Sequence, residues 1–388
     1  MRPLVESRKE LLGRILLLAA SVSSALLLAE AVVRLFFRDR FDTEMLRAFY
    51  APTSLTNYVR PSADPALFLE LMPNVDLDLG SWRVMTDREG VRVPGTPQEP
   101  EAAAPVRIAV LGDSTSFGLR VNYEDTYPEL YRMQMAAETK RAVALRNYSV
   151  PAYNSQQELR AFLTRVLPDH PDLLILHYDH NDAEPTGYRF SPDYIRPEYG
   201  DNLLHSALLK VALRKLAELR NRRLTSFDER EQQYVKGAGG YLVGGPLYEA
   251  HLSTLKTLAE TSRAQNIPTI VVVFNAFAQY DPGYASDPDY ILLEKNLSAR
   301  LETMGFHVLD LYSHYQEKMK SMGWSDLSAW WISRTPPVDG HPNPEGHRFI
   351  AEQLCAFTRE RPELMAIFEG RAAEGSSPSA PATAAAAR

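Results

Sequence analysis

The sequence predicts an α/β protein built on a doubly wound parallel sheet that is flanked by helices. Three observations predict this class: apolar runs of strand length recur along the chain, helical stretches separate them, and several of the runs are apolar at consecutive positions rather than at alternate ones. A strand that is apolar throughout has both faces buried, which is the situation in a parallel sheet covered by helices on each side.

The elements follow in chain order. Apolar runs predict five strands, at residues 106–111, 145–150, 173–178, 267–274 and 306–311. Helical spacing predicts helices between them, at 127–139, 247–265 and 290–304. A last helix begins after Asn343, which can cap it, and Pro344 suits its first position.

The N-terminal region holds the one membrane signal. Residues 15–29 carry no charge but span only about 22 Å, and extension to Phe37 gives about 35 Å, enough for a hydrocarbon core of roughly 30 Å. Basic residues precede this stretch, so we expect a short inner tail and an exported chain. The alternative is a signal peptide cleaved near Ala29 and Ala31, which also exports the domain.

We expect four parts in the chain. Residues 1–37 form a cytoplasmic tail and transmembrane anchor or signal peptide, and 38–105 a membrane-proximal stalk and Pro-rich linker. Residues 106–369 form the catalytic domain, with a helical insertion at 183–245, and 370–388 a disordered tail. A basic amphipathic helix at 202–223 could be a lid on an anionic surface, but we favour a solvated helix face.

Composition excludes some functions. The 388 residues carry a net charge of -7, which argues against nucleic acid as a partner. Cys355 is the only cysteine, so no disulfide can form within the chain, and its apolar neighbours indicate a buried side chain. We expect no cofactor.

Ser114 is the candidate nucleophile, since the strand at 106–111 leads directly into Gly112-Asp113-Ser114. A serine hydroxyl needs a base, usually a histidine oriented by a carboxylate, and His341 precedes the last helix. The Asn181 amide could donate to a developing oxyanion. Plainer roles for these three residues are a helix cap, an exposed loop histidine and a turn residue, and we prefer the catalytic interpretation.

These residues resemble the GDSL-type hydrolases, also called the SGNH family, over about residues 106–357. The resemblance rests on Gly112-Asp113-Ser114, on Asn181-Asp182, and on the histidine motif from His341 to His347. It implies a flavodoxin-like three-layer fold and an acyl-enzyme mechanism without a metal. The expected oxyanion hole consists of the Ser114 and Ala152 N–H groups and the Asn181 side chain. Each of the three follows a predicted strand, so they should meet at one sheet edge.

Three positions depart from the family pattern. Ala152 stands where the family has a glycine, and its N–H can serve if the position does not need a positive φ. Asp179 replaces a glycine and brings a carboxylate near the pocket. Val338 occupies the usual place of the acid, so we assign Asp339 as the residue that orients His341. Asp113 and Asp179 are expected to support the site.

Other polar residues have structural interpretations. His347 falls in the first helical turns, where a structural hydrogen bond is favoured over chemistry. Imidazole and carboxylate groups in 177–182 suit zinc, but strand alternation points His177 and Asp179 to one face and His180 and Asp182 to the other. No metal site is therefore expected.

The leading hypothesis is an exported, membrane-tethered serine esterase that removes an acyl group, acetyl first, from an envelope carbohydrate or lipid. The first alternative is an O-acyltransferase acting on an extracellular polysaccharide, because a sugar hydroxyl can resolve the same acyl-enzyme. The second is a catalytically inactive SGNH-like module that binds a glycan or an envelope partner.

Overall fold

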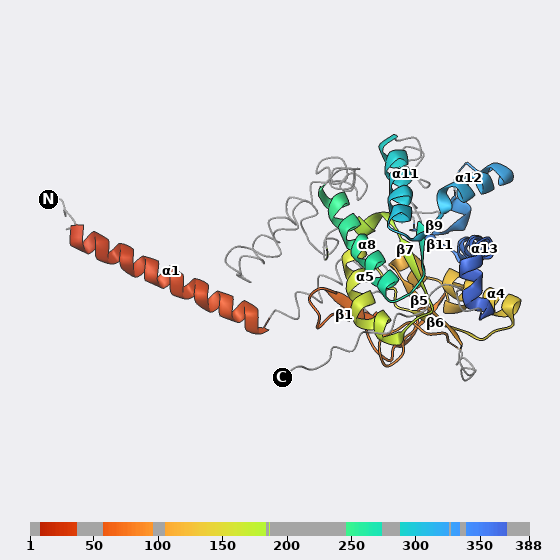
Figure 1. Cartoon of the computed structure of the whole chain (residues 1–388). Helices are drawn as coiled ribbons and strands as arrows, with labels where there is room; N and C mark the ends of the chain where they lie inside the picture. The colour runs from red at the N-terminus through yellow and green to blue at the C-terminus, as the bar shows by residue number, and fades with distance from the viewer. Residues whose placement is uncertain are drawn as a thin grey trace, which may run out of the picture. The chain divides into compact units, whose positions relative to one another are not determined.

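The computed structural model describes residues 8–36, 57–95, 105–183, 186, 246–273, 288–325, 327–333 and 339–370 (Figure 1). The predicted insertion helix at 202–223 and the tail after Gly370 lie outside the described residues. The chain divides into two compact units, Met1–Glu70 with Glu184–Tyr241, and Leu71–Ala183 with Leu242–Arg388.

The first unit contains the apolar N-terminal helix. Helix α1 covers Arg8–Phe36. Its segment Leu11–Val32 has 22 residues and a mean hydropathy of 2.2, and its apolar residues are not buried. At about 1.5 Å per residue this segment is about 33 Å long, which is enough to cross a bilayer. A signal sequence would have the same length and composition. In the same unit, strand β1 (Val59–Pro61) pairs with β2 (Leu69–Leu71).

The second unit is built on a five-stranded parallel sheet. Its strands are β5 (Val106–Leu111), β6 (Val143–Asn147), β7 (Leu173–Tyr178), β8 (Thr269–Val273) and β9 (His307–Asp310). They lie in the order β6-β5-β7-β8-β9, and every neighbouring pair is parallel. The chain therefore reverses its direction of winding at β5, and ligand sites form at such a switch point, beyond the strands' carboxyl ends.

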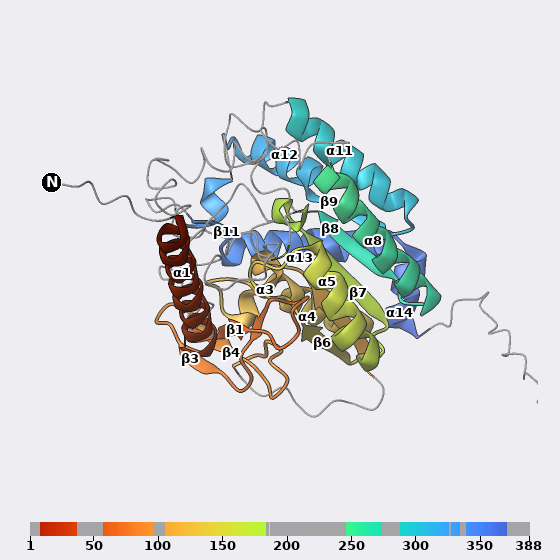
Figure 2. The ribbon, with the colours of Figure 1, turned by 90° about the vertical axis from the view of Figure 1, so that its left-hand side faces the viewer.

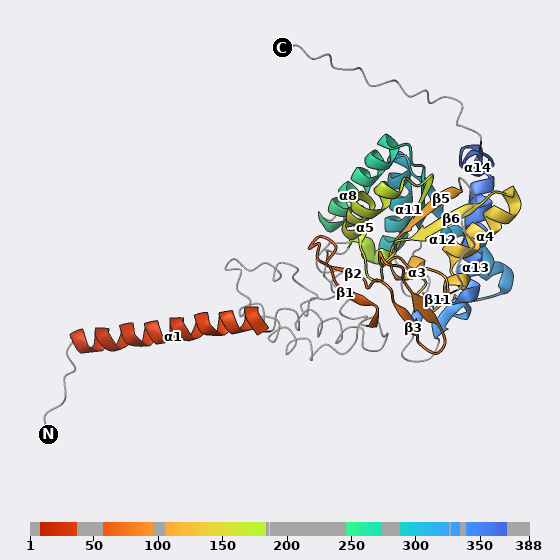
Figure 3. The same ribbon diagram turned by 90° about the horizontal axis from the view of Figure 1, so that it is seen from below.

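Helices cover both faces of this sheet (Figures 2 and 3). Ile108, Val110 and Ile175 point to one face and share a core with helices packed there: α4 (Tyr127–Thr139), α12 (Leu311–Met322), α13 (Pro344–Arg359) and α14 (Pro362–Glu369). Alternate residues such as Leu174 and Leu176 are also fully buried and point to the other face. That face lies on the side of α5 (Ser155–Ala161) and α8 (Pro246–Ala264). The predicted fold class is confirmed.

Some elements differ from the sequence prediction. The strand predicted at 145–150 is Val143–Asn147, because the chain turns after Asn147 while its side chains stay buried. Helix α5 was not predicted, since its buried residues include the polar Gln157 and Glu158 and leave no apolar stripe. Helices α12 and α14 were not predicted either, and α11 (Pro288–Thr303) corresponds to the predicted 290–304.

Residues 71–95 belong to the same unit as the sheet. Strands β3 (Asp76–Asp78) and β4 (Arg83–Met85) form an antiparallel hairpin. Arg92 then forms an isolated bridge with Asn147, at the end of edge strand β6. This part of the predicted stalk is thus packed with the sheet, whereas the domain boundaries at 37, 105 and 369 stay predictions.

The turn after β5 allows only glycine at its first position. Gly112 has φ 152°, and a Cβ there would lie 2.2 Å from Ser116 Oγ and 2.7 Å from His177 Cβ on β7. A side chain at 112 would therefore push the turn away from the sheet. The next residues begin helix α3 (Ser114–Phe117), so the candidate nucleophile is the first residue of that helix.

Candidate functional site

Ser114 and His341 are brought together from sequence positions far apart. His341 Nε2 lies 2.9 Å from Ser114 Oγ, within hydrogen-bond reach of a nucleophile and its base. His341 is carried by strand β11 (Asp339–Pro342), which pairs with β10 (Trp331–Ser333). The helix cap anticipated at Asn343 is present, and its side chain accepts from the N–H groups of Glu345 and Gly346, which anchors the end of the histidine loop.

Asp113 lies in the turn 112–114, here called the nucleophile turn because it carries the candidate nucleophile, and its side chain stabilises that turn. It is 3% exposed, and its Oδ1 accepts the N–H of Thr115 at 2.9 Å. Its Oδ2 accepts the Ser114 hydroxyl at 3.2 Å. Because Ser114 has one hydroxyl proton, that proton is bonded either to Asp113 or to His341. The shorter contact to His341 is the arrangement that a proton transfer needs.

Asp179 lies beside Thr115, on the sheet side of the nucleophile turn. Its Oδ2 is 3.5 Å from Thr115 Oγ1, and its N–H donates to Asp182 Oδ2 at 3.0 Å. It is buried, and it contributes a carboxylate under the turn where the family pattern has glycine. Strand β7 ends at Tyr178 and a 3₁₀ turn, His180–Ala183, follows, so the strand alternation assumed for 177–182 does not continue through Asp182.

The two other histidines of the site have structural partners. Tyr127 links them: its hydroxyl lies 3.1 Å from His177 Nδ1, and its N–H donates to His347 Nδ1 at 3.2 Å. The structural hydrogen bond expected of His347 is confirmed. Burial, reinforced by the charge of Arg92, lowers the pKa of His347 to about 3, so its ring is neutral at ordinary pH. A neutral ring that already accepts a backbone N–H is a poor candidate for the general base.

Two buried carboxyl groups lie near the site, and neither was assigned a role from the sequence. Burial and then the charge of Asp113 raise the pKa of Glu158 well above its ordinary value. Burial and then the charge of Glu158 raise the pKa of Asp182 in the same direction. Both groups are therefore favoured in the neutral form, which limits the negative charge around Asp113 and Asp179. For Glu158, the sequence signal is the helix cap Asn154-Ser155 at the start of α5, which predicts a helix but not a buried carboxyl group.

Three residues could hold a metal ion. One ligand atom from each of Asp113, His177 and Asp179 lies within 4.8 Å of the other two, and all three side chains are buried. The donor set of one imidazole and two carboxylates suits zinc or manganese. Asp113 and His177 already bond to the nucleophile turn and to Tyr127. The expectation that the protein uses no metal stays a prediction.

Ala152 adopts the conformation that glycine favours. Its φ is 69°, so the condition under which alanine could replace glycine without strain is not met. It lies after β6, beyond the carboxyl end of that strand, as predicted from the sequence. Asn181 is in the 3₁₀ turn after β7 and Asp339 begins β11. Both side chains lie outside the described part of the structure, so the roles assigned to Asn181 and Asp339 stay predictions.

One known protein family is identified by its model. The model of the GDSL-like Lipase/Acylhydrolase family matches residues 110–349. No curated protein matches the chain. Among solved structures, the chain is similar to esterase EstA from Pseudoalteromonas sp., with 17% identity, 66% of this chain and 97% of that chain covered, and a TM-score of 0.38. It is also similar to an acetylxylan esterase from Geobacillus stearothermophilus, with 13% identity, 66% and 96% covered, and a TM-score of 0.40.

The strain at Ala152 can be measured. Replacement by glycine should raise the free energy of unfolding by about 1 kcal/mol, because it removes a left-handed Cβ conflict that outweighs the added freedom of the unfolded chain. Urea denaturation of the full chain measures the change.

The control is Ala250→Gly, at an exposed position in α8, which should lower the unfolding free energy by about 1 kcal/mol. If Ala152→Gly destabilises the protein as Ala250→Gly does, the left-handed conformation at 152 is not strained.

Proposed function

Since the chain belongs to the GDSL-like lipase/acylhydrolase family and is therefore an ester-bond hydrolase, we propose that it works as a serine esterase with Ser114 as nucleophile. The observation that carries the proposal is the 2.9 Å contact between Ser114 Oγ and His341 Nε2. Ser114 is only partly buried at the start of α3, whereas Thr115, Ser116 and Phe117 behind it are buried. The hydroxyl thus combines access to a substrate with a base in reach.

The reaction proceeds through an acyl-enzyme. His341 Nε2 takes the Ser114 proton while Oγ attacks the ester carbonyl carbon, and a tetrahedral oxyanion forms. The N–H groups of Ser114 and Ala152 and the Asn181 amide donate to this oxyanion. The tetrahedral species then collapses, His341 protonates the leaving alcohol, and the acyl group stays on Oγ. A water molecule deprotonated by His341 attacks this ester and releases the acid.

Asp339 is the proposed orienting acid. A carboxylate that accepts the Nδ1 proton of His341 leaves Nε2 free of a proton and directed at Ser114. Asp339 and His341 lie in the same strand, β11, two residues apart. The pairing of β11 with β10 shifts register between Asp339 and Pro342, so the support for Asp339 is its closeness to His341 along this strand.

The proposed substrate is an acyl ester of an envelope carbohydrate or lipid, with acetyl as the first acyl group to test. The support is the apolar segment Leu11–Val32, which would retain the enzyme at a membrane surface if it is not cleaved. Arg2, Arg8 and Lys9 precede this segment and Arg14 lies near its N-terminal end, which favours a catalytic domain on the exported side.

The nucleophile and base can be tested together. Ser114→Ala should abolish hydrolysis of p-nitrophenyl acetate, because the proposed acyl-enzyme forms on Ser114 Oγ. His341→Ala should lower kcat by about 10²–10⁴-fold, the contribution of a general base. The control is His347→Asn, whose amide oxygen can still accept the Tyr127 N–H and which should retain most activity. Wild-type turnover in Ser114→Ala, or a large loss in His347→Asn without one in His341→Ala, contradicts the assignment.

The orienting acid is tested by two isosteric changes. Asp339→Asn should lower kcat by about 10⁴-fold, because the amide favours the wrong imidazole tautomer. Asp179→Asn should have a much smaller effect, since Asp179 bonds on the Thr115 side of the turn. Steady-state kinetics measure both. If Asp179→Asn shows the larger loss, the acid is Asp179, and if neither variant slows acylation, the enzyme uses a Ser-His dyad.

The proposed location also makes a prediction. The full chain should remain with membranes after carbonate washing, because an uncleaved α1 has no other way to cover its apolar surface. A phosphatase fused to the C-terminus, active only after export, should be active. If the phosphatase fusion is inactive while a C-terminal fusion to a reporter that works only in the cytoplasm is active, the orientation is contradicted. Release of the whole domain by carbonate contradicts the anchor.

A further inference from the structure

Arg92 is a fully buried cation beside the nucleophile turn. It is 1% exposed and lies outside residues 110–349, which the family model matches. Its guanidinium donates to the carbonyls of Phe117, of Gly118 at 2.9 Å and of Val121 at 2.6 Å. Burying a guanidinium is costly unless its donors are bonded, and these carbonyls accept from both of its terminal nitrogens.

Two of these carbonyls, those of Phe117 and Gly118, belong to the last residue of helix α3 and to its cap. Gly118 closes this helix with φ 80°, and its N–H bonds back to the carbonyls of Ser114 and Thr115. A Cβ at Gly118 would lie 2.8 Å from Arg92 Nη1 and 2.3 Å from Thr126 Cγ2, so glycine leaves the space that the guanidinium occupies. With only four residues in α3, the position of its last carbonyls fixes that of Ser114 at its start.

Aromatic rings enclose the same guanidinium. Its carbon lies 4.4 Å from the centre of the Phe117 ring, 5.8 Å from that of Trp82 and 6.0 Å from that of Tyr123. Ring faces attract cations and compensate part of the lost hydration. Phe117 is therefore held by Arg92 through both its ring and its carbonyl.

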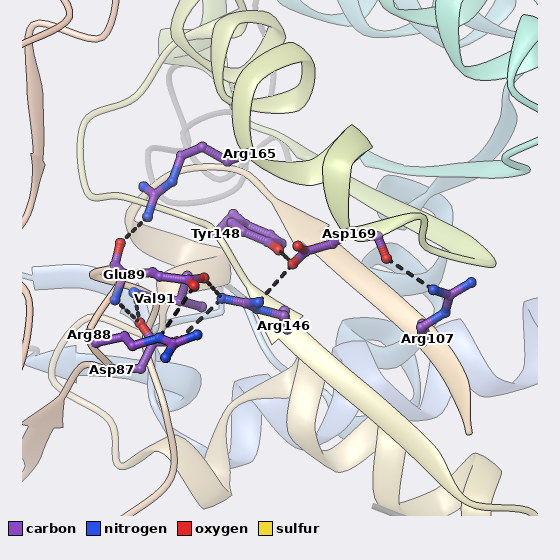
Figure 4. Close-up of polar contacts among 9 residues, drawn as sticks. All are labelled: Asp87, Arg88, Glu89, Val91, Arg107, Arg146, Tyr148, Arg165 and Asp169. Carbon is purple, nitrogen blue, oxygen red and sulfur yellow. Dashed lines mark hydrogen bonds and ion pairs between the residues drawn. The ribbon is translucent and has the colours of Figure 1, made fainter. Parts of the chain in front are cut away.

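The backbone around Arg92 is fixed against the edge of the sheet. Arg92 bridges to Thr86 and to Asn147, and the Asn147 amide donates to the Ser116 carbonyl at 2.7 Å. Beside this bridge, Arg146 forms ion pairs with Asp87 at 3.3 Å, with Glu89 at 2.5 Å and with Asp169 at 2.8 Å (Figure 4). The loop that carries Arg92 is thus attached to β6 by a backbone bridge and by ion pairs.

We propose that Arg92 is a positioning residue for the nucleophile turn, acting from a segment that precedes the family's own motifs. By holding the last carbonyls of α3, it sets where the Ser114 hydroxyl and N–H lie relative to His341. This inference rests on the proposed function of Ser114. A displacement of the nucleophile by about 1 Å is enough to lower the rate of an enzyme about 10²-fold.

The test compares three variants of the full chain. Arg92→Met keeps the apolar stem but removes every donor, and Arg92→Lys restores a cation with fewer, differently directed donors. Arg83→Met is the matched control, because Arg83 is in the same segment but is half-exposed and pairs with Asp76. An aryl phosphonate titrates the reactive serines to completion, and kcat per titrated site and KM are measured with p-nitrophenyl acetate, beside thermal unfolding.

The expected result is a selective loss of kcat. Arg92→Met should lower kcat per titrated site on the order of 10–100-fold with KM changed by less than about twofold, since substrate binding is not what the carbonyl contacts control. Arg92→Lys should fall between Arg92→Met and the wild type, and Arg83→Met should match the wild type. This pattern differs from simple destabilisation, which lowers the number of titrated sites and leaves kcat per site unchanged.

Two outcomes overturn the proposal. The first is an unchanged kcat per titrated site in Arg92→Met, which shows that Arg92 supports only folding. The second applies if Arg92→Met does not fold: a wild-type kcat per titrated site in Arg92→Lys then overturns the positioning role. If Ser114→Ala hydrolyses the ester as fast as the wild type, the proposed function fails together with this inference. If Ser114→Ala is inactive while the Arg92 variants turn over normally, only the positioning role is lost.

Discussion

The close packing of the nucleophile turn on strand β7 is the constraint on which the rest of the site depends. It requires glycine at 112, where a Cβ would lie 2.7 Å from His177 Cβ. Because the turn lies this close to the sheet, Asp113 can cap α3 and Asp179 can reach Thr115. The parallel strand order places this turn at the point where the winding of the sheet reverses, and so at the usual position of a site in such folds.

Around this turn the protein buries several groups that carry charge in water. The pKa shifts favour neutral Glu158, Asp182 and His347, which limits the number of buried charges that need a partner. Arg92 differs from these three groups, since its charge persists at all ordinary pH values and is met by carbonyls and ring faces. His341 differs from His177 and His347 because it is only partly buried. It is thus the histidine that can exchange protons with a substrate and with water.

The sequence predicts the sheet better than it predicts the site. Strands β5 and β7 have the predicted limits because each contains several consecutive apolar residues, whereas β6 ends at Asn147, before buried residues that belong to a turn. The approach of His341 to Ser114 was predicted only through the resemblance of their motifs to those of the GDSL-type hydrolases, because no periodicity in the sequence relates positions so far apart. Arg92 and Glu158 could not be predicted, because a buried charged side chain depends on tertiary partners that leave no local pattern.

The most direct test of the central claim is covalent labelling of the full chain with an aryl phosphonate, followed by peptide mapping by mass spectrometry. The account predicts one adduct, on the peptide that contains Ser114, formed at a rate that falls at least about 10²-fold in His341→Ala because the base is lost. An adduct on another residue, or labelling of Ser114 at the wild-type rate without His341, would contradict it.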